Sequence, residues 1–189
     1  FDRSAVKRVL VFDLGGGDDS AAVKSTSASS KLYLNTGSGN DTILLSGRFG
    51  QSTVAGGEGK DKINFTSPTD GLTIITADSG NDRITATGSI LGGDGDDVLF
   101  ANAGENILDG GKGADYILTG GGDVIILRAG DGRATPDDAD RIKDFTDGTD
   151  IFGLVGGLTF SELTIVQGTG SNSAHTVISK TSSSEYLAV

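Results

Sequence analysis

"GGDGDDVL", residues 92–99, places three glycines and three aspartates ahead of two aliphatic residues. Glycine permits the positive φ angles that tight turns need, and aspartate favours turns while offering carboxylate oxygens. A single stretch of this kind fits a linker, a phosphate-binding loop or a metal site equally well. The number of its copies decides among these, because self-similarity along a chain indicates a repeat fold.

Seven further stretches share this pattern and its phase, the last of them one residue short. The eight rows are "LGGGDDSA" (14–21), "TGSGNDTI" (36–43), "GGEGKDKI" (56–63), "ADSGNDRI" (77–84), "GGDGDDVL" (92–99), "ANAGENIL" (101–108), "GGKGADYI" (110–117) and "TGGGDVI" (119–125). Their sixth positions are Asp19, Asp41, Asp61, Asp82, Asp97, Asn106, Asp115 and Asp123. An aliphatic residue follows two places later in every row. A disordered Gly/Ser linker, the weaker alternative, would not keep that phase.

The composition points to cations as partners. The chain has 189 residues, 31 glycines and a formal net charge of -11. Aspartate supplies 22 of the 26 acids, and its short side chain suits tight turns and oxygen ligation. Such acidity argues against nucleic acid or an anionic membrane as a partner, because both require a positive surface. No apolar run is long enough to span a membrane, and no cysteine is present.

The repeated unit resembles the nonapeptide G-G-x-G-x-D-x-U-x of the RTX (repeats-in-toxin) family over roughly residues 14–127, most regularly at 92–117. The resemblance implies an all-β fold, a right-handed parallel β-roll or β-helix solenoid with Ca²⁺ in its glycine-rich turns. Elementary chemistry agrees, because Ca²⁺ takes six to eight oxygens and accepts backbone carbonyls beside carboxylates. One acid per loop supplies too few ligands, so we expect stacked loops to share several ions, roughly five to seven in all.

The spacing of the sixth positions predicts how the loops stack. Two nonapeptides make one turn of about 18 residues in the family's architecture. One column of loops should therefore run through Asp19, Asp41, Asp61, Asp82, Asp97 and Asp115, and a second, short column should hold Asn106 and Asp123. Where loops occur every half-turn, from Asp97 onward, both edges are expected to bind metal. Before that point the segments 25–30, 46–52, 66–71 and 86–89 should form the opposite edge, with short strands such as 31–34 and 72–76 between.

The tail departs from the repeat. "DADRIKDFTDGTDIFGL" (138–154) resembles the segment that closes β-rolls in serralysin-like proteins, which implies that Asp140 is a ligand of the last calcium. The stretches 163–168, 175–179 and 185–189 then predict a small antiparallel cap that covers the open end of the roll. The expected organisation is an N-terminal cap strand (1–12), a calcium-binding β-roll (13–135) and a C-terminal β cap (136–189).

The predicted metal ligands combine the sixth-position side chains with residues at the first, third and fourth positions of the loops, where carbonyls turn inward. The full set is Asp19, Thr36, Ser38, Gly39, Asp41, Gly56, Glu58, Gly59, Asp61, Ala77, Ser79, Gly80, Asp82, Gly92, Asp94, Gly95, Asp97, Asn106, Gly110, Lys112, Gly113, Asp115, Asp123 and Asp140.

These features predict a calcium-binding module without catalytic activity of its own. A single histidine, His175, excludes a three-histidine zinc site, and there is no cysteine nucleophile. The resemblance implies a secreted or cell-surface bacterial protein, with N-terminal parent domains and a type I secretion apparatus as partners. Two alternatives remain open: a surface-layer or adhesin element whose roll is itself a binding surface, and an accessory module of a polysaccharide-modifying enzyme.

Overall fold

The structure, a computed structural model, describes residues 9–66, 73–183 and 185–189. Within these residues the chain is built from β-strands and three short 3-10 helices, so the predicted all-β class is confirmed. The helices are η2 (Pro136–Asp138), η3 (Phe160–Glu162) and η4 (Gly170–Asn172). None of the described helices is long and apolar enough to cross a membrane.

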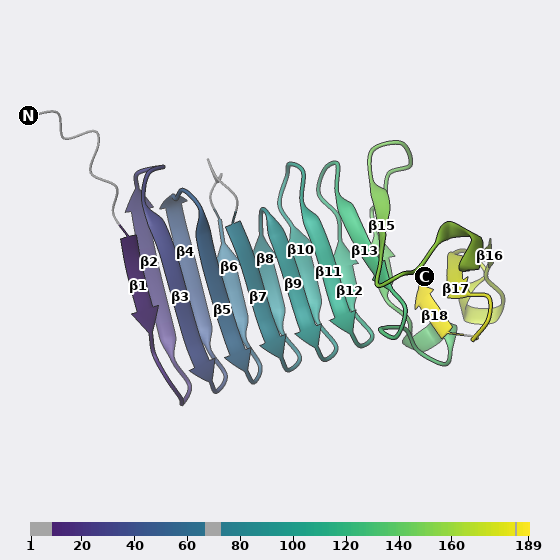
Figure 1. Cartoon of the computed structure of the whole chain (residues 1–189), viewed down its shortest axis with the longest axis horizontal. Coiled ribbons are helices and arrows are strands. Elements are labelled where there is room, and N and C mark those ends of the chain that lie inside the picture. Colours follow the sequence, from purple (N-terminus) through teal and green to yellow (C-terminus); the bar gives the residue numbers. More distant parts are fainter. Residues whose placement is uncertain (1–8, 67–72, 184) are drawn as a thin grey trace, which may run out of the picture.

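Alternate strands build two parallel sheets that run along the molecule (Figure 1). The eight-stranded sheet holds β1 (Val9–Asp13), β3 (Lys31–Ser38), β5 (Ser52–Glu58), β7 (Thr73–Ser79), β9 (Ser89–Asp94), β11 (Ile107–Lys112), β13 (Val124–Arg128) and β15 (Ile151–Val155). The seven-stranded sheet holds β2 (Ser20–Thr26), β4 (Thr42–Arg48), β6 (Lys62–Phe65), β8 (Arg83–Ala86), β10 (Val98–Ala101), β12 (Tyr116–Leu118) and β14 (Arg141–Lys143). Each turn of the chain adds one strand to each sheet, which confirms the parallel solenoid.

The two edges of this solenoid differ in their turns. At the first edge, a strand of the eight-stranded sheet leads into the next strand of the seven-stranded sheet through a glycine-rich turn, along the lower side of Figure 1. At the second edge, the chain returns to the eight-stranded sheet. The predicted second-edge segment 66–71 and the predicted strand 72–76 lie partly outside the described residues, because 67–72 are not among them. Residues 1–8 of the predicted N-terminal cap also lie outside them, and Val9–Asp13 pairs in parallel with β3.

The core lies between the two sheets and is filled by columns of stacked aliphatic side chains. Strand side chains alternate between the two faces of a sheet, so one residue of each x-U-x segment points inward. Ile63, Ile84 and Leu99 are paired in register on successive strands and are almost fully buried. The other buried members of the eighth position are Ile43, Leu108, Ile117 and Ile125. The predicted inward aliphatic position is therefore the core of the roll.

The C-terminal residues form a third sheet that lies beyond the end of the roll (Figure 1). Its antiparallel strands are β16 (Leu163–Gln167), β17 (Thr176–Lys180) and β18 (Glu185–Ala188), close to the stretches that the sequence predicted. The amide of Val189 donates to the carbonyl of Asp140 at 2.7 Å, and its own carbonyl accepts from the amide of Ile142 at 3.0 Å. Leu127 of the roll packs with Leu158 and Leu187 of the cap, so this sheet covers the last turn.

Candidate calcium-binding edge

Seven aspartates stand one above another along the first edge and are joined by hydrogen bonds. In each step the backbone amide of one aspartate donates to a carboxylate oxygen, Oδ1, of the aspartate in the next turn. The bonds are Asp19 to Asp41 (2.7 Å), Asp41 to Asp61 (2.8 Å), Asp61 to Asp82 (2.6 Å), Asp82 to Asp97 (2.8 Å), Asp97 to Asp115 (2.8 Å) and Asp115 to Asp140 (3.0 Å). We call this series the aspartate ladder. It brings together the predicted first column and adds Asp140 at its end.

The second oxygen of these carboxylates is buried and lacks a donor. Within the described part of the chain, Oδ2 has no hydrogen-bond partner in the first six members of the aspartate ladder: Asp19, Asp41, Asp61, Asp82, Asp97 and Asp115. A buried carboxylate oxygen without a donor or a counter-charge is costly, and native proteins rarely leave one so. Six such atoms in one line indicate that a cation completes them.

Glycine makes room for that cation. A Cβ atom on Gly92 would overlap Oδ2 of Asp97, and a Cβ on Gly110 would overlap Oδ2 of Asp115. The first position of these rows therefore leaves a space beside the unpartnered oxygen that any side chain would fill. Thr36 and Ala77 occupy this position in two other rows, and both are fully buried. The rows at 56–63, 92–99 and 110–117, which have glycine there, offer the most open sites.

The turns also stack too closely for side chains at two further positions. Gly93 and Gly95 have φ angles of 124° and 143°, in the region that favours glycine. A Cβ on Gly95 would overlap the carbonyl oxygen of Gly80 in the preceding turn. Asp78 replaces glycine at the equivalent of Gly93 and keeps a positive φ of 71°. Backbone oxygens of adjacent turns are thereby held close together, as shared carbonyl ligation requires.

Burial and mutual repulsion perturb the acids of the aspartate ladder. The pKa of Asp82 and of Asp97 is raised to about 7, mainly by burial and also by neighbouring carboxylates, although the donated amide hydrogen bond lowers it. Burial likewise raises the pKa of Asp115 to about 6. Arg133 partly offsets the charge of Asp115, and a divalent cation would supply the rest of the counter-charge that these carboxylates need.

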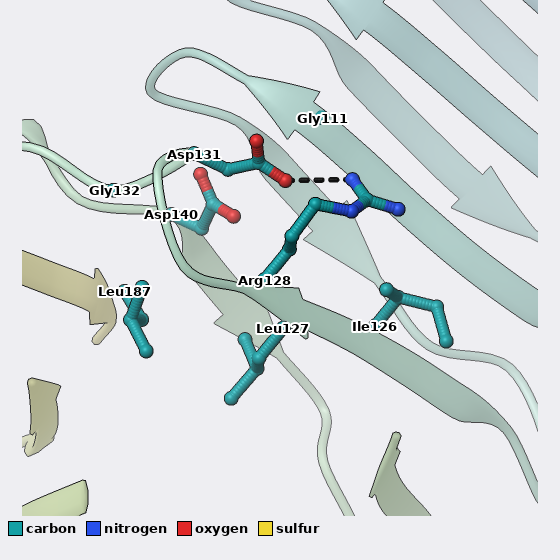
Figure 2. Close-up of a pocket in the computed structure, with 8 residues that line it drawn as sticks. All are labelled: Gly111, Ile126, Leu127, Arg128, Asp131, Gly132, Asp140 and Leu187. Atoms are coloured by element: carbon teal, nitrogen blue, oxygen red, sulfur yellow. Dashed lines mark hydrogen bonds and ion pairs between the residues drawn. The ribbon is translucent and has the colours of Figure 1, made fainter. Parts of the chain in front are cut away.

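The last member of the aspartate ladder lies in a second acidic setting. Burial, together with the charges of Asp115 and Asp131, raises the pKa of Asp140 to about 8. Figure 2 shows the carboxylates of Asp140 and Asp131 next to each other, with the Arg128 guanidinium to their right and joined to Asp131 by a dashed line. Arg128 forms an ion pair with Asp131 at 2.7 Å and another with Asp109 at 2.8 Å. Asp131 is thus neutralised by an arginine, whereas Asp140 accepts only the Asp115 amide on its side chain among the described residues.

The remaining predicted ligands divide by their position in the loop. The first-position residues Thr36, Gly56, Ala77, Gly92 and Gly110 are buried. The third-position side chains of Ser38, Glu58, Asp94 and Lys112 are exposed, and that of Ser79 is half-buried. Lys112 and Asp94 form a surface ion pair with each other at 2.8 Å, so they can contribute to the edge only through their backbone. Gly39, Gly59, Gly80, Gly95 and Gly113 form the close stack of fourth positions with positive φ.

The described residues contain no group of three or more His, Cys, Asp or Glu side chains that could hold a metal ion. The predicted geometry requires no such group, because each of two turns is expected to supply one carboxylate. Carbonyl oxygens must then complete the six to eight ligands of Ca²⁺.

The second edge has a different set of hydrogen bonds. The amide of Asn106 donates to Asp123 Oδ1 at 2.9 Å, and the amide of Asp123 donates to Asp150 Oδ1 at 2.8 Å. Unlike in the aspartate ladder, the other carboxylate oxygens are also bonded, because Gly120 donates to Asp123 Oδ2 and Thr146 to Asp150 Oδ2. At Asn106 an amide side chain stands where the other rows have an acid, and its Nδ2 donates to Asp123 Oδ1 at 2.8 Å. Metal ligation by Asn106 and Asp123 stays a prediction, and it would have to displace these bonds.

Two features escaped the sequence reasoning. Asp150, 3% exposed, closes the second column; the sequence placed it with Gly148 in the closing segment 138–154 but assigned it to no column. The fifth positions form an outer series, in which the amide of Asn40 donates to Asp18 at 2.8 Å and that of Ala114 donates to Asp96 at 2.9 Å. In the sequence, only the frequent Asp and Asn at the fifth position indicated this outer series.

Comparison with protein families identifies part of this edge. Residues 91–126 match the family described as the RTX calcium-binding nonapeptide repeat (4 copies). A search of curated proteins gives no match. The matched segment contains Asp97, Asn106, Asp115 and Asp123, so the RTX repeats recognised in the sequence are confirmed there. The rows before residue 91 lie outside the match, and their aspartates continue the same ladder without a break.

Proposed function

We propose that this chain is a non-catalytic, calcium-binding β-roll module of a larger secreted protein, and that calcium is held between the turns of the aspartate ladder. The observation that carries the proposal is the line of six buried Oδ2 atoms without a partner among the described residues. The six hydrogen-bonded steps of the ladder offer one site each, which agrees with the expected five to seven ions. Carboxylates from two turns and backbone carbonyls would form each site.

The same arrangement supports a role that depends on the compartment. Extracellular calcium modules bind with Kd on the order of 10⁻⁴ to 10⁻³ M, far above free cytosolic calcium. A chain that folds only when its acids are neutralised would therefore stay extended inside a cell and fold outside it. Export of an unfolded chain through a type I apparatus, followed by folding around extracellular calcium, is the function that fits this behaviour.

A pair of amide variants tests the ligand assignment. Asp97→Asn removes one carboxylate charge shared by two steps of the aspartate ladder, and we expect it to raise the calcium midpoint about tenfold or more. Even outer-shell partners of metals typically cost 10- to 100-fold in affinity. Asp147→Asn, at an exposed position, makes the same chemical change away from the ladder. Calcium titration followed by circular dichroism measures both; equal midpoints for the two variants would refute the assignment.

Truncation before the cap tests whether the third sheet supports folding. Removing residues 156–189 leaves all the strands of the two parallel sheets but exposes Leu127 and frees the backbone of Asp140. Because solenoid ends need capping, we expect a several-fold higher calcium midpoint and a shallower transition. Leu187→Ala, 3% exposed against the roll, should act in the same direction, whereas Phe160→Ala, 73% exposed, should not. The cap has no such role if the truncated and intact chains titrate alike.

A further inference from the structure

The outer face of the seven-stranded sheet carries positive charge although the chain as a whole is strongly acidic. The strands of this sheet contain no Asp or Glu. They contain Lys24, Lys62, Arg83, Arg141 and Lys143, all exposed or half-buried. Since the alternate residues Ile63 and Ile84 point into the core, Lys62 and Arg83 point outward. The acids and the bases are therefore separated on the surface.

Register places four of these bases, Lys62, Arg83, Arg141 and Lys143, in two adjacent rows that run along the roll. Lys62 pairs with Arg83, and further along the same row Tyr116 pairs with Arg141. Phe100 and Lys143 belong to the neighbouring row, where Leu118 pairs with both. Neighbouring strands lie about 4.8 Å apart, so four strand spacings from β6 to β14 give a strip of about 19 Å. We call the outward residues of these two rows the basic strip.

The bases of the basic strip form no ion pair among the described residues, unlike three bases elsewhere. Among the described residues, none of Lys62, Arg83, Arg141 and Lys143 forms an ion pair. By contrast, ion pairs link Lys112 to Asp94, Arg128 to Asp109 and Asp131, and Arg133 to Asp96. Four bases of this face thus carry positive charge without an ion pair among the described residues.

Aromatic rings give the basic strip a flat centre. The guanidinium carbon of Arg83 lies 4.2 Å from the centroid of the Phe100 ring, and Tyr116 follows with its ring centroid 6.2 Å from that of Phe100. The Arg83 guanidinium packs over the Phe100 ring, and its remaining N–H groups can donate to a planar carboxylate. Along its two rows, the basic strip therefore offers cationic side chains on both sides of a central pair of aromatic rings.

We propose that the basic strip binds a linear anionic polysaccharide, a chain of sugars that carry carboxylates. A narrow polymer can lie on one face, with its carboxylates on the bases and the apolar faces of its sugars on the rings. Duplex nucleic acid carries one charge per about 1.7 Å and a membrane surface is broad. Both would meet the acidic first edge within a Debye length of roughly 8–10 Å, so the net charge of -11 disfavours them.

Fluorescence anisotropy in millimolar calcium tests this proposal with a labelled glucuronic-acid oligosaccharide. We expect it to bind the intact chain, and the neutral glucose oligosaccharide of equal length to bind at least about tenfold more weakly. The double variant Lys62→Gln/Arg83→Gln should lose at least about tenfold in affinity, because two charge-assisted contacts are removed. Lys31→Gln/Lys180→Gln removes two positive charges outside the strip and should bind as the intact chain does. Circular dichroism confirms that both variants fold with calcium.

Three outcomes would overturn the proposal. The first is equal binding of the acidic and the neutral oligosaccharide. The second is equal affinity of the two double variants, which would place the binding elsewhere. The third is binding of duplex DNA or of anionic phospholipid vesicles that depends on Lys62 and Arg83 while the glucuronic-acid oligosaccharide does not bind; the strip would then serve another polyanion. None of these results bears on calcium binding by the aspartate ladder, which is measured separately.

Discussion

Chelating calcium with EDTA at neutral pH is expected to abolish the β-sheet signal of the far-UV circular dichroism spectrum and leave a coil-like one. The six buried Oδ2 atoms then face one another with neither a donor among the described residues nor a cation, and the uncompensated charge of -11 adds to the repulsion. Since the sites do not exist in the unfolded chain, the free energy of calcium binding is also free energy of folding.

Adding calcium back should restore the β-sheet circular dichroism spectrum over a narrow range of calcium concentration, because adjacent turns share ions. Magnesium provides the control. Mg²⁺ requires six oxygen ligands in octahedral geometry at about 2.0–2.1 Å, and it loses its bound water slowly. The same concentration of Mg²⁺ should therefore restore little β structure. A chain that stays folded in EDTA, or one that stays coil-like in excess calcium, would contradict coupled folding.

Acid should partly replace calcium in the metal-free chain. Burial raises the folded-state pKa of Asp82 and Asp97 to about 7 and that of Asp140 to about 8, above the usual Asp value of about 3.9 that the unfolded chain keeps. The folded state then binds more protons, so its stability is fully present below about pH 4 and is lost as the pH rises through 7 to 8. Each carboxyl contributes on the order of a few kcal/mol to this change.

In EDTA, therefore, β structure should increase when the pH is lowered from 8 to 5. In the presence of calcium, lowering the pH should have the opposite effect on folding. Protons then compete with calcium for the same carboxylates and raise the calcium midpoint at pH 5. Asp97→Asn, a neutral mimic of the protonated acid, should make the metal-free chain less sensitive to pH than Asp147→Asn does. A metal-free chain that is equally unstructured at pH 5 and pH 8 would show that carboxylate repulsion does not oppose folding.

The sequence was sufficient for the features that depend on local spacing. The phase between the sixth-position acid and the eighth-position aliphatic predicted both the aspartate ladder and the buried column of Ile63, Ile84 and Leu99. A two-residue period fixes which side chain points inward, so no long-range information was needed. Asp140 entered through the resemblance of its segment, and the structure places it directly after Asp115.

Features that depend on register between distant turns could not be read in the same way. Lys62, Arg83 and Arg141 are scattered among acids in the sequence, and the net charge argued against nucleic acid or an anionic membrane as a partner. Only the stacking of β6, β8 and β14 gathers them on one face. The second column was predicted from its spacing, but its hydrogen-bonded carboxylates depend on loop backbones, such as that of Thr146, whose course the pattern does not specify.

The lengths of the turns indicate where such a chain tolerates change. Successive members of the aspartate ladder are 22, 20, 21, 15, 18 and 25 residues apart, yet their hydrogen bonds stay between 2.6 and 3.0 Å. Variation in length is absorbed in the second-edge loops of the earlier turns and, in the last turn, in the stretch around η2 that precedes Asp140. A peptide inserted at 27–29 should thus be displayed without disturbing metal binding, whereas insertion of one residue at 93–95 should abolish it locally. Gain and loss of residues during evolution would be confined in the same way.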